Sequence, residues 1–185
     1  MNAVASISGT TATKLLWPES SIPTTFTICA VTRYNGASRK RILGCYGSPT
    51  QTTVNWMHGQ WDGKRGLSYY AGWKTLEASH GVVDDWLVMC GTNDAGVAPP
   101  GNHILDQDEM GTAAGGVGSG TLNIGYQSPY HSDWSLHSVL IWDYSLGTVP
   151  VPWHTRPCLC NLVAGSVHRT LPVLRFGDAW NCWGR

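Results

Sequence analysis

The stretch "SDWSLHSVLIWDYSL", from Ser132 to Leu146, carries most of the information about the fold of this chain. It opens with a polar turn that Asp133 can cap, and then becomes almost wholly apolar. Strict alternation would place Trp134, Leu136, Ser138, Leu140 and Trp142 on one face, and His137, Val139, Ile141 and Asp143 on the other. Since both faces are largely apolar, the pattern predicts a strand covered on both sides, or one whose second face lines a ligand groove.

Similar strand signals recur upstream about every ten residues, separated by turn residues, which is the spacing of an all-β domain. One pair of strands is split by Asp62-Gly63, a hairpin signal, and no convincing helix occurs before residue 148. We therefore predict a two-sheet antiparallel β-sandwich, a jelly roll, over about residues 20–148. The expected buried residues are Phe26, Ile28, Val31, Leu87, Met89, Leu122, Ile124, Val139 and Ile141.

The composition agrees with this class. Charged residues make up 13% of the 185 residues, while glycine (22) and tryptophan (10) are abundant, which suits strands and tight turns better than a helical bundle. Lys+Arg and Asp+Glu both number 12, so the chain lacks the positive charge of a nucleic-acid binder. The basic clusters 39–41 and 64–65 are expected to be solvated turns, with an anionic-sugar site as the alternative.

The two ends of the chain differ from this middle part. Residues 1–19 are interpreted as an N-terminal arm or edge strand, and they lack the features of a signal peptide. No apolar run is long enough to span a membrane. Residues 149–185 scatter Pro, Cys and Trp without period, so we expect an irregular tail outside the core fold, with disorder as one interpretation.

The six cysteines are irregularly spaced, and their redox state is open at this point. Cys29 and Cys90 lie within apolar strand-like runs, where a free cysteine behaves as a small core residue. We expect buried thiols at both positions, with a Cys29–Cys45 bridge as the weaker alternative.

Four segments, taken in order, resemble the concanavalin A-like and laminin-G-like jelly rolls. In the final strand Val139, Ile141, Trp142 and Leu146 fall on that family's apolar positions, although His137 and Ser138 stand where it commonly carries Asp-Glu. The resemblance covers about residues 20–148, and the other three segments are "DDWLVMCGTND", "NHILDQDEMG" and "LNIG". It implies a non-catalytic carbohydrate-binding or adhesion module with a glycan or protein ligand, and it favours an extracellular location.

Two alternatives remain open. Related glucanases cleave sugars with a closely spaced pair of carboxylates on one strand, and Glu19, Glu77 and Glu109 do not have that spacing. We therefore expect no catalytic residues and no enzyme activity, although a glycoside-active enzyme using Asp84, Asp85 or Asp133 is an alternative. A protein-interaction domain without a sugar site is the other.

The cluster "NWMHGQWDGKRGLSYYAGWKT" gives the candidate ligand site. Sugar C–H faces stack on aromatic rings, while amide, imidazole and carboxylate groups bond sugar hydroxyls. We accordingly predict that the ligand-binding residues are Asn55, His58, Trp61, Asp62 and Trp73, with Trp56 in the core on the same strand face as His58. Ca²⁺ is the one cofactor considered, because clustered oxygen ligands suit it; its predicted ligands are Asp106, Asp108 and Asp133, with turn capping as the alternative.

Overall fold

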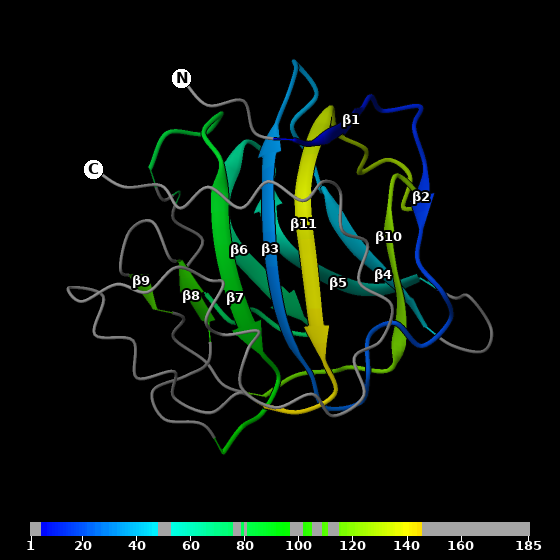
Figure 1. Ribbon diagram of the computed structural model, residues 1–185, viewed down its shortest axis with the longest axis vertical. Helices are drawn as coiled ribbons and strands as arrows, with labels where there is room; N and C mark the ends of the chain where they lie inside the picture. Colours follow the sequence, from blue (N-terminus) through cyan, green and yellow to red (C-terminus); the bar gives the residue numbers. More distant parts are fainter. Residues whose placement is uncertain are drawn as a thin grey trace.

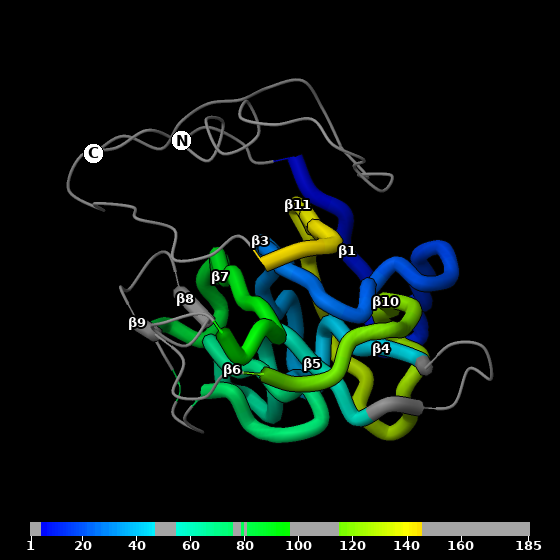
Figure 2. The backbone as a smooth tube through the Cα atoms, turned by 90° about the horizontal axis from the view of Figure 1, so that it is seen from below, coloured from blue at the N-terminus to red at the C-terminus, as the bar shows by residue number. Residues whose placement is uncertain are grey.

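The computed structural model describes residues 5–47, 53–75, 79, 81–96, 102–104, 109–110 and 115–145. These residues form two antiparallel sheets packed face to face as a β-sandwich, and they contain no helix (Figures 1 and 2). The predicted fold class is therefore confirmed. The predicted tail, residues 149–185, lies outside the described residues.

One sheet has six strands in the described part of the chain, in the order β1-β11-β3-β7-β8-β9. Figure 1 looks onto this sheet, with β11, β3 and β7 side by side at its centre. Its strands are β1 (Ile7–Gly9), β3 (Thr27–Tyr34), β7 (Leu87–Thr92), β8 (Asn102–Ile104), β9 (Glu109–Met110) and β11 (Trp134–Trp142).

The second sheet lies behind the first in Figure 1 and has five strands among the described residues, in the order β2-β10-β4-β5-β6. They are β2 (Leu15–Leu16), β4 (Leu43–Gly47), β5 (Thr53–Trp61), β6 (Lys64–Tyr70) and β10 (Gly120–Ile124). The predicted Asp62-Gly63 turn joins β5 to β6, and both residues have positive φ (49° and 76°), as a tight two-residue hairpin of type I′ requires.

The core lies between the sheets and is unusually aromatic. Phe26, Trp56 and Tyr70 pack against one another, with ring centroids 5.1–5.9 Å apart, and all three are buried. Of the nine residues predicted to be buried, Val31 and Ile141 are only half-buried: Val31 faces outward on β3, whereas Ile141 packs against the core. The other predicted core residues are buried.

A β-bulge in β11 corrects the predicted alternation of the strand that decided the fold. Leu136 pairs with Thr32 and Ser138 with Val31, so His137 is the extra residue. Beyond it the faces are exchanged, and Val139 and Ile141 follow Trp134 and Leu136 into the core. The outward positions after the bulge are Ser138, Leu140 and Trp142. The bulge explains why the sequence shows apolar residues in both alternating sets. Residues of one set face the core before the bulge, and residues of the other set face it afterwards.

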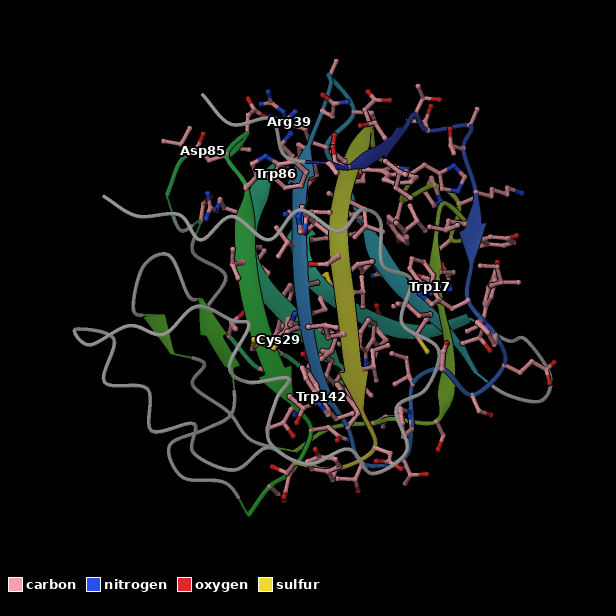
Figure 3. The ribbon with its side chains drawn as sticks, in the orientation of Figure 1. Trp17, Cys29, Arg39, Asp85, Trp86 and Trp142 are labelled. Atoms are coloured by element: carbon pink, nitrogen blue, oxygen red, sulfur yellow. A yellow bond between two sulfur atoms is a disulfide. The ribbon has the colours of Figure 1, made fainter. Side chains whose placement is uncertain are left out.

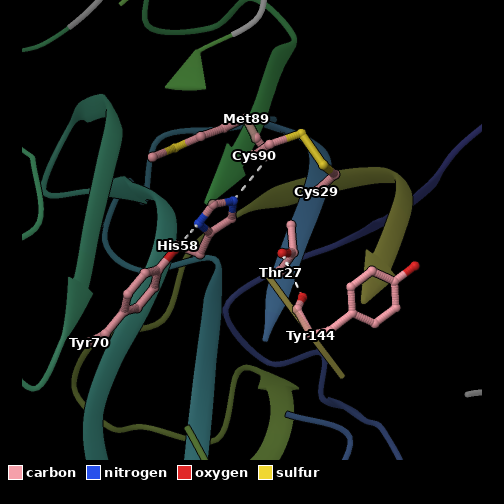
Figure 4. Close-up of a disulfide and its surroundings, with 7 residues drawn as sticks. All are labelled: Thr27, Cys29, His58, Tyr70, Met89, Cys90 and Tyr144. Carbon is pink, nitrogen blue, oxygen red and sulfur yellow. Dashed lines mark hydrogen bonds between the residues drawn. A yellow bond between two sulfur atoms is a disulfide. The ribbon is translucent and has the colours of Figure 1, made fainter. Parts of the chain in front are cut away.

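The expectation of free thiols at positions 29 and 90 was wrong, and so was the alternative Cys29–Cys45 bridge. Cys29 and Cys90 form a disulfide between β3 and β7 (Figure 4). Cys45 is a free, buried thiol. The two half-cystines are direct partners in the antiparallel ladder, with their Cα atoms 4.1 Å apart. Their side chains point away from the core, opposite to Ile28, Ala30 and Met89.

The N-terminal segment supplies one strand to each sheet. β1 pairs with β11 at the edge of the six-stranded sheet, and β2 pairs with β10 at the edge of the five-stranded sheet. Trp17 follows β2 directly and is buried, with its backbone N–H donated to the carbonyl of Leu122. The described part of the chain contains no helix long and apolar enough to cross a membrane.

Candidate functional site

The outer face of the five-stranded sheet brings together three of the predicted ligand-binding residues. Across the sheet, one row of outward positions runs through Leu16, Asn123, Gly44, Met57 and Tyr69. Tyr69 packs edge-on against Trp73, with ring centroids 5.3 Å apart, and Trp73 is 36% exposed. Asn55, two residues before Met57 on β5, is exposed.

The second aromatic pair on this face consists of Trp61, at the end of β5, and Tyr130. Their ring centroids are 5.0 Å apart, and Tyr130 is 41% exposed. Tyr130 comes from the loop 125–131 after β10, which folds over the sheet. We call the set Trp61, Tyr69, Trp73 and Tyr130, with Arg41 and Asn55, the aromatic platform.

Arg41 joins the Trp61–Tyr130 pair to Asn55. Its guanidinium lies 5.2 Å from the ring centroid of Trp61 and 5.4 Å from that of Tyr130, as in cation–π contacts. Its Nη2 donates to Asn55 Oδ1 at 2.9 Å, and its Nη1 donates to the carbonyl of Trp56 and to Gln127 Oε1. Arg41 is only 6% exposed, and burial lowers its pKa to about 10, which keeps it protonated at neutral pH.

A glycine allows the loop 125–131 to lie this close to the sheet. A Cβ at Gly44 would come within 3.0 Å of Gln127 Oε1 and 3.2 Å of Asn123 Oδ1. Gln127 in turn donates from Nε2 to the carbonyl of Cys45, so it bridges β4 and Arg41. The floor beneath the platform is therefore fixed by polar contacts to buried groups.

A second cation lies against an aromatic ring on the same loop. Lys14 Nζ is 5.3 Å from the ring centroid of Tyr126, and Tyr126 packs edge-on against Tyr46 at 5.5 Å. Tyr46 also donates its hydroxyl to the carbonyl of Tyr126 at 2.6 Å. The exposed Lys14 and the buried Arg41 thus flank neighbouring residues of one loop, Tyr126 and Gln127.

Two predicted ligand-binding residues lie elsewhere. His58 shares the inward face of β5 with Trp56, as expected, and is fully buried between the sheets. Its Nδ1 lies 2.8 Å from the Tyr70 hydroxyl and its Nε2 lies 3.1 Å from the carbonyl of Met89 (Figure 4). Asp62 sits at the β5–β6 turn, where it pairs with Lys40. Neither belongs to the aromatic platform.

The predicted metal ligands are not brought together in the described part of the chain. Asp133 accepts backbone N–H groups from Thr11 (3.2 Å) and Ser38 (3.0 Å), and so joins two loops. Asp106 and Asp108 lie outside the described residues. Among the described side chains no group of three His, Cys, Asp or Glu could hold a metal ion.

The acids considered for the enzyme alternative lie near the 36–40 loop. Asp84 pairs with Arg39 at 2.7 Å, and Asp133 bonds the Ser38 backbone. Figure 3 shows Asp85, Trp86 and Arg39 gathered at one end of the six-stranded sheet, with Trp142 toward the other end. Among the described residues, Asp84 is thus held in an ion pair and Asp133 in hydrogen bonds to the loop backbone.

No protein-family model and no curated protein matches this chain. The concanavalin A-like resemblance consequently rests on the residues quoted above. The strand order itself establishes a two-sheet antiparallel sandwich.

Sequence reasoning missed Arg41, Gln127 and Tyr130 as members of the site. Arg41 was expected to be a solvated turn residue, yet it is buried beside Trp61. The sequence offered one weak signal for Tyr130, which is an aromatic residue next to Pro129 on the connection between two predicted strands. Because Arg41 precedes β4 and the other two residues lie in the loop 125–131, only the strand order places them together beside Trp61.

Proposed function

We propose that this protein is a non-catalytic carbohydrate-binding module of the concanavalin A-like class, with the aromatic platform as its ligand site. The observation that carries the proposal is the pairing of partly exposed rings, Tyr69–Trp73 and Trp61–Tyr130, with Asn55 on the same sheet face. Ring faces offer stacking surface to sugar C–H groups, and the amide of Asn55 offers hydrogen bonds to hydroxyls.

The rigidity of the platform favours binding. Hydrogen bonds to buried carbonyls hold Arg41 and the 125–131 loop, and Arg41 packs against Trp61 and Tyr130, so these two rings have little side-chain freedom to lose when a ligand binds. Two pairs of partly exposed rings on one sheet face suit an extended chain of sugar units better than a small enclosed ligand. The adhesion alternative would use the same exposed rings against a protein surface, and binding experiments separate the two.

The matched pair Tyr130→Ala and Tyr144→Ala tests the proposal. The two tyrosines are almost equally exposed, at 41% and 40%, but Tyr144 follows β11 on the other sheet. We expect Tyr130→Ala to weaken glycan binding about 10-fold, the loss of roughly one ring contact, and Tyr144→Ala to leave it unchanged. Binding is measured by calorimetry with glycans selected on an array, and melting temperatures verify folding.

Two results would count against the proposal. Equal glycan affinities of Tyr130→Ala and Tyr144→Ala would show that binding does not use the platform ring Tyr130. Release of reducing ends from a bound glycan, abolished by replacing Asp84 or Asp133, would favour the glycoside-active enzyme instead.

A further inference from the structure

Three consecutive cations, Arg39, Lys40 and Arg41, have very different surroundings. Arg39 pairs with Asp84 and Lys40 pairs with Asp62, and both cations are largely exposed. Arg41 is buried, yet within the described part of the chain no carboxylate lies at ion-pair distance from it. Its partners are the neutral oxygens of Asn55, Trp56 and Gln127.

Burying a guanidinium without a counter-charge is costly, because neutral oxygens replace only part of its hydration. The described contacts leave the Nε–H of Arg41 without a hydrogen-bond partner. Its Nη2 lies at the outer end, where it bonds the exposed Asn55. The positive charge is therefore fixed beneath the platform, with Nη2 toward the surface and no carboxylate of the described residues at ion-pair distance.

Lys14 extends this charge along the same sheet face. It contacts the ring of Tyr126, and the ion pairs found among the described residues do not include it. Tyr126 directly precedes Gln127, which bonds Arg41. Two cations that form no ion pair within the described part of the chain thus flank the 125–131 loop, next to rings suited to stacking.

We propose that the aromatic platform selects acidic glycans, sugars that carry carboxylate or sulfate groups, and that Arg41 is the residue that recognises their charge. The inference rests on the proposed function and narrows its substrate class. The charge of a guanidinium attracts carboxylate and sulfate oxygens, and this attraction is stronger where neighbouring rings exclude water. Nη2, which bonds the exposed Asn55, is the nitrogen of Arg41 nearest to such a ligand. Lys14 would attract a second anionic group further along the chain of sugars.

The first experiment compares ligands that differ only in charge. Oligogalacturonate is tested against its fully methyl-esterified form, and dextran sulfate against unmodified dextran, each by calorimetry with the full chain. We expect at least one acidic member to bind about 10- to 100-fold more tightly than its neutral counterpart, the range of a charge-assisted hydrogen bond. The two pairs distinguish carboxylate from sulfate recognition. Equal binding of acidic and neutral members would overturn the inference while leaving the proposed function intact, whereas no binding to any array glycan would remove both.

The second experiment assigns the selectivity to a residue. Arg41→Gln and Arg39→Gln remove the same charge two positions apart, but only Arg41 belongs to the aromatic platform. We expect Arg41→Gln to abolish the preference for the acidic ligand and Arg39→Gln to retain it. If Arg41→Gln does not fold, Lys14→Gln, at an exposed position, serves as the second variant and should reduce acidic-ligand affinity several-fold, with a weaker dependence on salt. The assignment would be overturned if folded Arg41→Gln or Lys14→Gln kept the wild-type preference for the acidic ligand. It would also be overturned if Arg39→Gln lost as much of that preference as Arg41→Gln.

Discussion

At the scale of the residue, His58 illustrates how a side chain suited to ligand binding can instead link two sheets. The carbonyl of Met89 can only accept, so the Nε2 of His58 carries the proton and Nδ1 accepts from the Tyr70 hydroxyl. Both ring nitrogens are thereby satisfied inside the core. Burial lowers the pKa of His58 from 6.5 to about 4, because the charged form would lose its hydration.

This arrangement predicts a loss of stability in mild acid. Since the folded-state pKa lies below the unfolded one, the unfolded chain takes up a proton first as the pH falls. The free energy of unfolding should drop between about pH 6.5 and pH 4, by up to about 3 kcal/mol from this residue, and the stability should be fully present above pH 6.5. Urea unfolding of the wild type and of His58→Gln at several pH values measures the effect. A variant whose stability falls as steeply as the wild type over that window would contradict this origin.

At the scale of the element, the end of β2 places two neighbouring side chains on opposite sides of the sheet. Trp17 is 7% exposed within the core, whereas Leu16 is 42% exposed on the outer face. We expect Trp17→Ala to lower the free energy of unfolding by about 3–5 kcal/mol through the cavity that it leaves. Leu16→Ala, the matched control, should change it by less than about 0.5 kcal/mol. Chemical denaturation compares them, and similar values would show that the N-terminal segment is not anchored as described.

The strand pair β3–β7 supports a second prediction at this scale. The disulfide closes a loop between residues 61 apart in sequence, and a crosslink of that span restricts the unfolded chain. Replacing both half-cystines by alanine should reduce the free energy of unfolding by about 4 kcal/mol in the chain-entropy account. Cys45→Ala is the control for loss of a sulfur without loss of a crosslink. Identical denaturation midpoints for the double variant and the wild type would contradict the expectation.

Individual elements also show where sequence patterns suffice. The segments 27–34 and 87–92 are rich in β-branched and apolar residues between turn signals, and both are strands. β1 and β2 have three and two residues, too few for a period to be visible. The bulge at His137 and the Cys29–Cys90 pairing depend on register between strands distant in the chain, which no local pattern specifies.

At the scale of the whole molecule, sheet order decides which predicted site residues meet. Asn55, Trp61 and Trp73 are close together in the sequence, and the sandwich places them on one outer face. Period-two alternation also assigned Trp56 and His58 to a common face, but alternation cannot tell the inner face from the outer one. Arg41 and Tyr130 join the site only because β4 and the loop after β10 lie beside β5.

The pairing of β1 with β11 and of β2 with β10 has a consequence for synthesis on the ribosome. The first strands to emerge find their ladder partners only after more than a hundred further residues have been made, as the Ser8–Ser135 hydrogen bond, spanning 127 positions, illustrates. Until then the nascent chain carries Trp17 and the open edges of β3 and β4 unprotected. Such late closure favours slow folding and exposes the growing polypeptide to aggregation, so productive folding of this domain would depend on protection of its first half during translation.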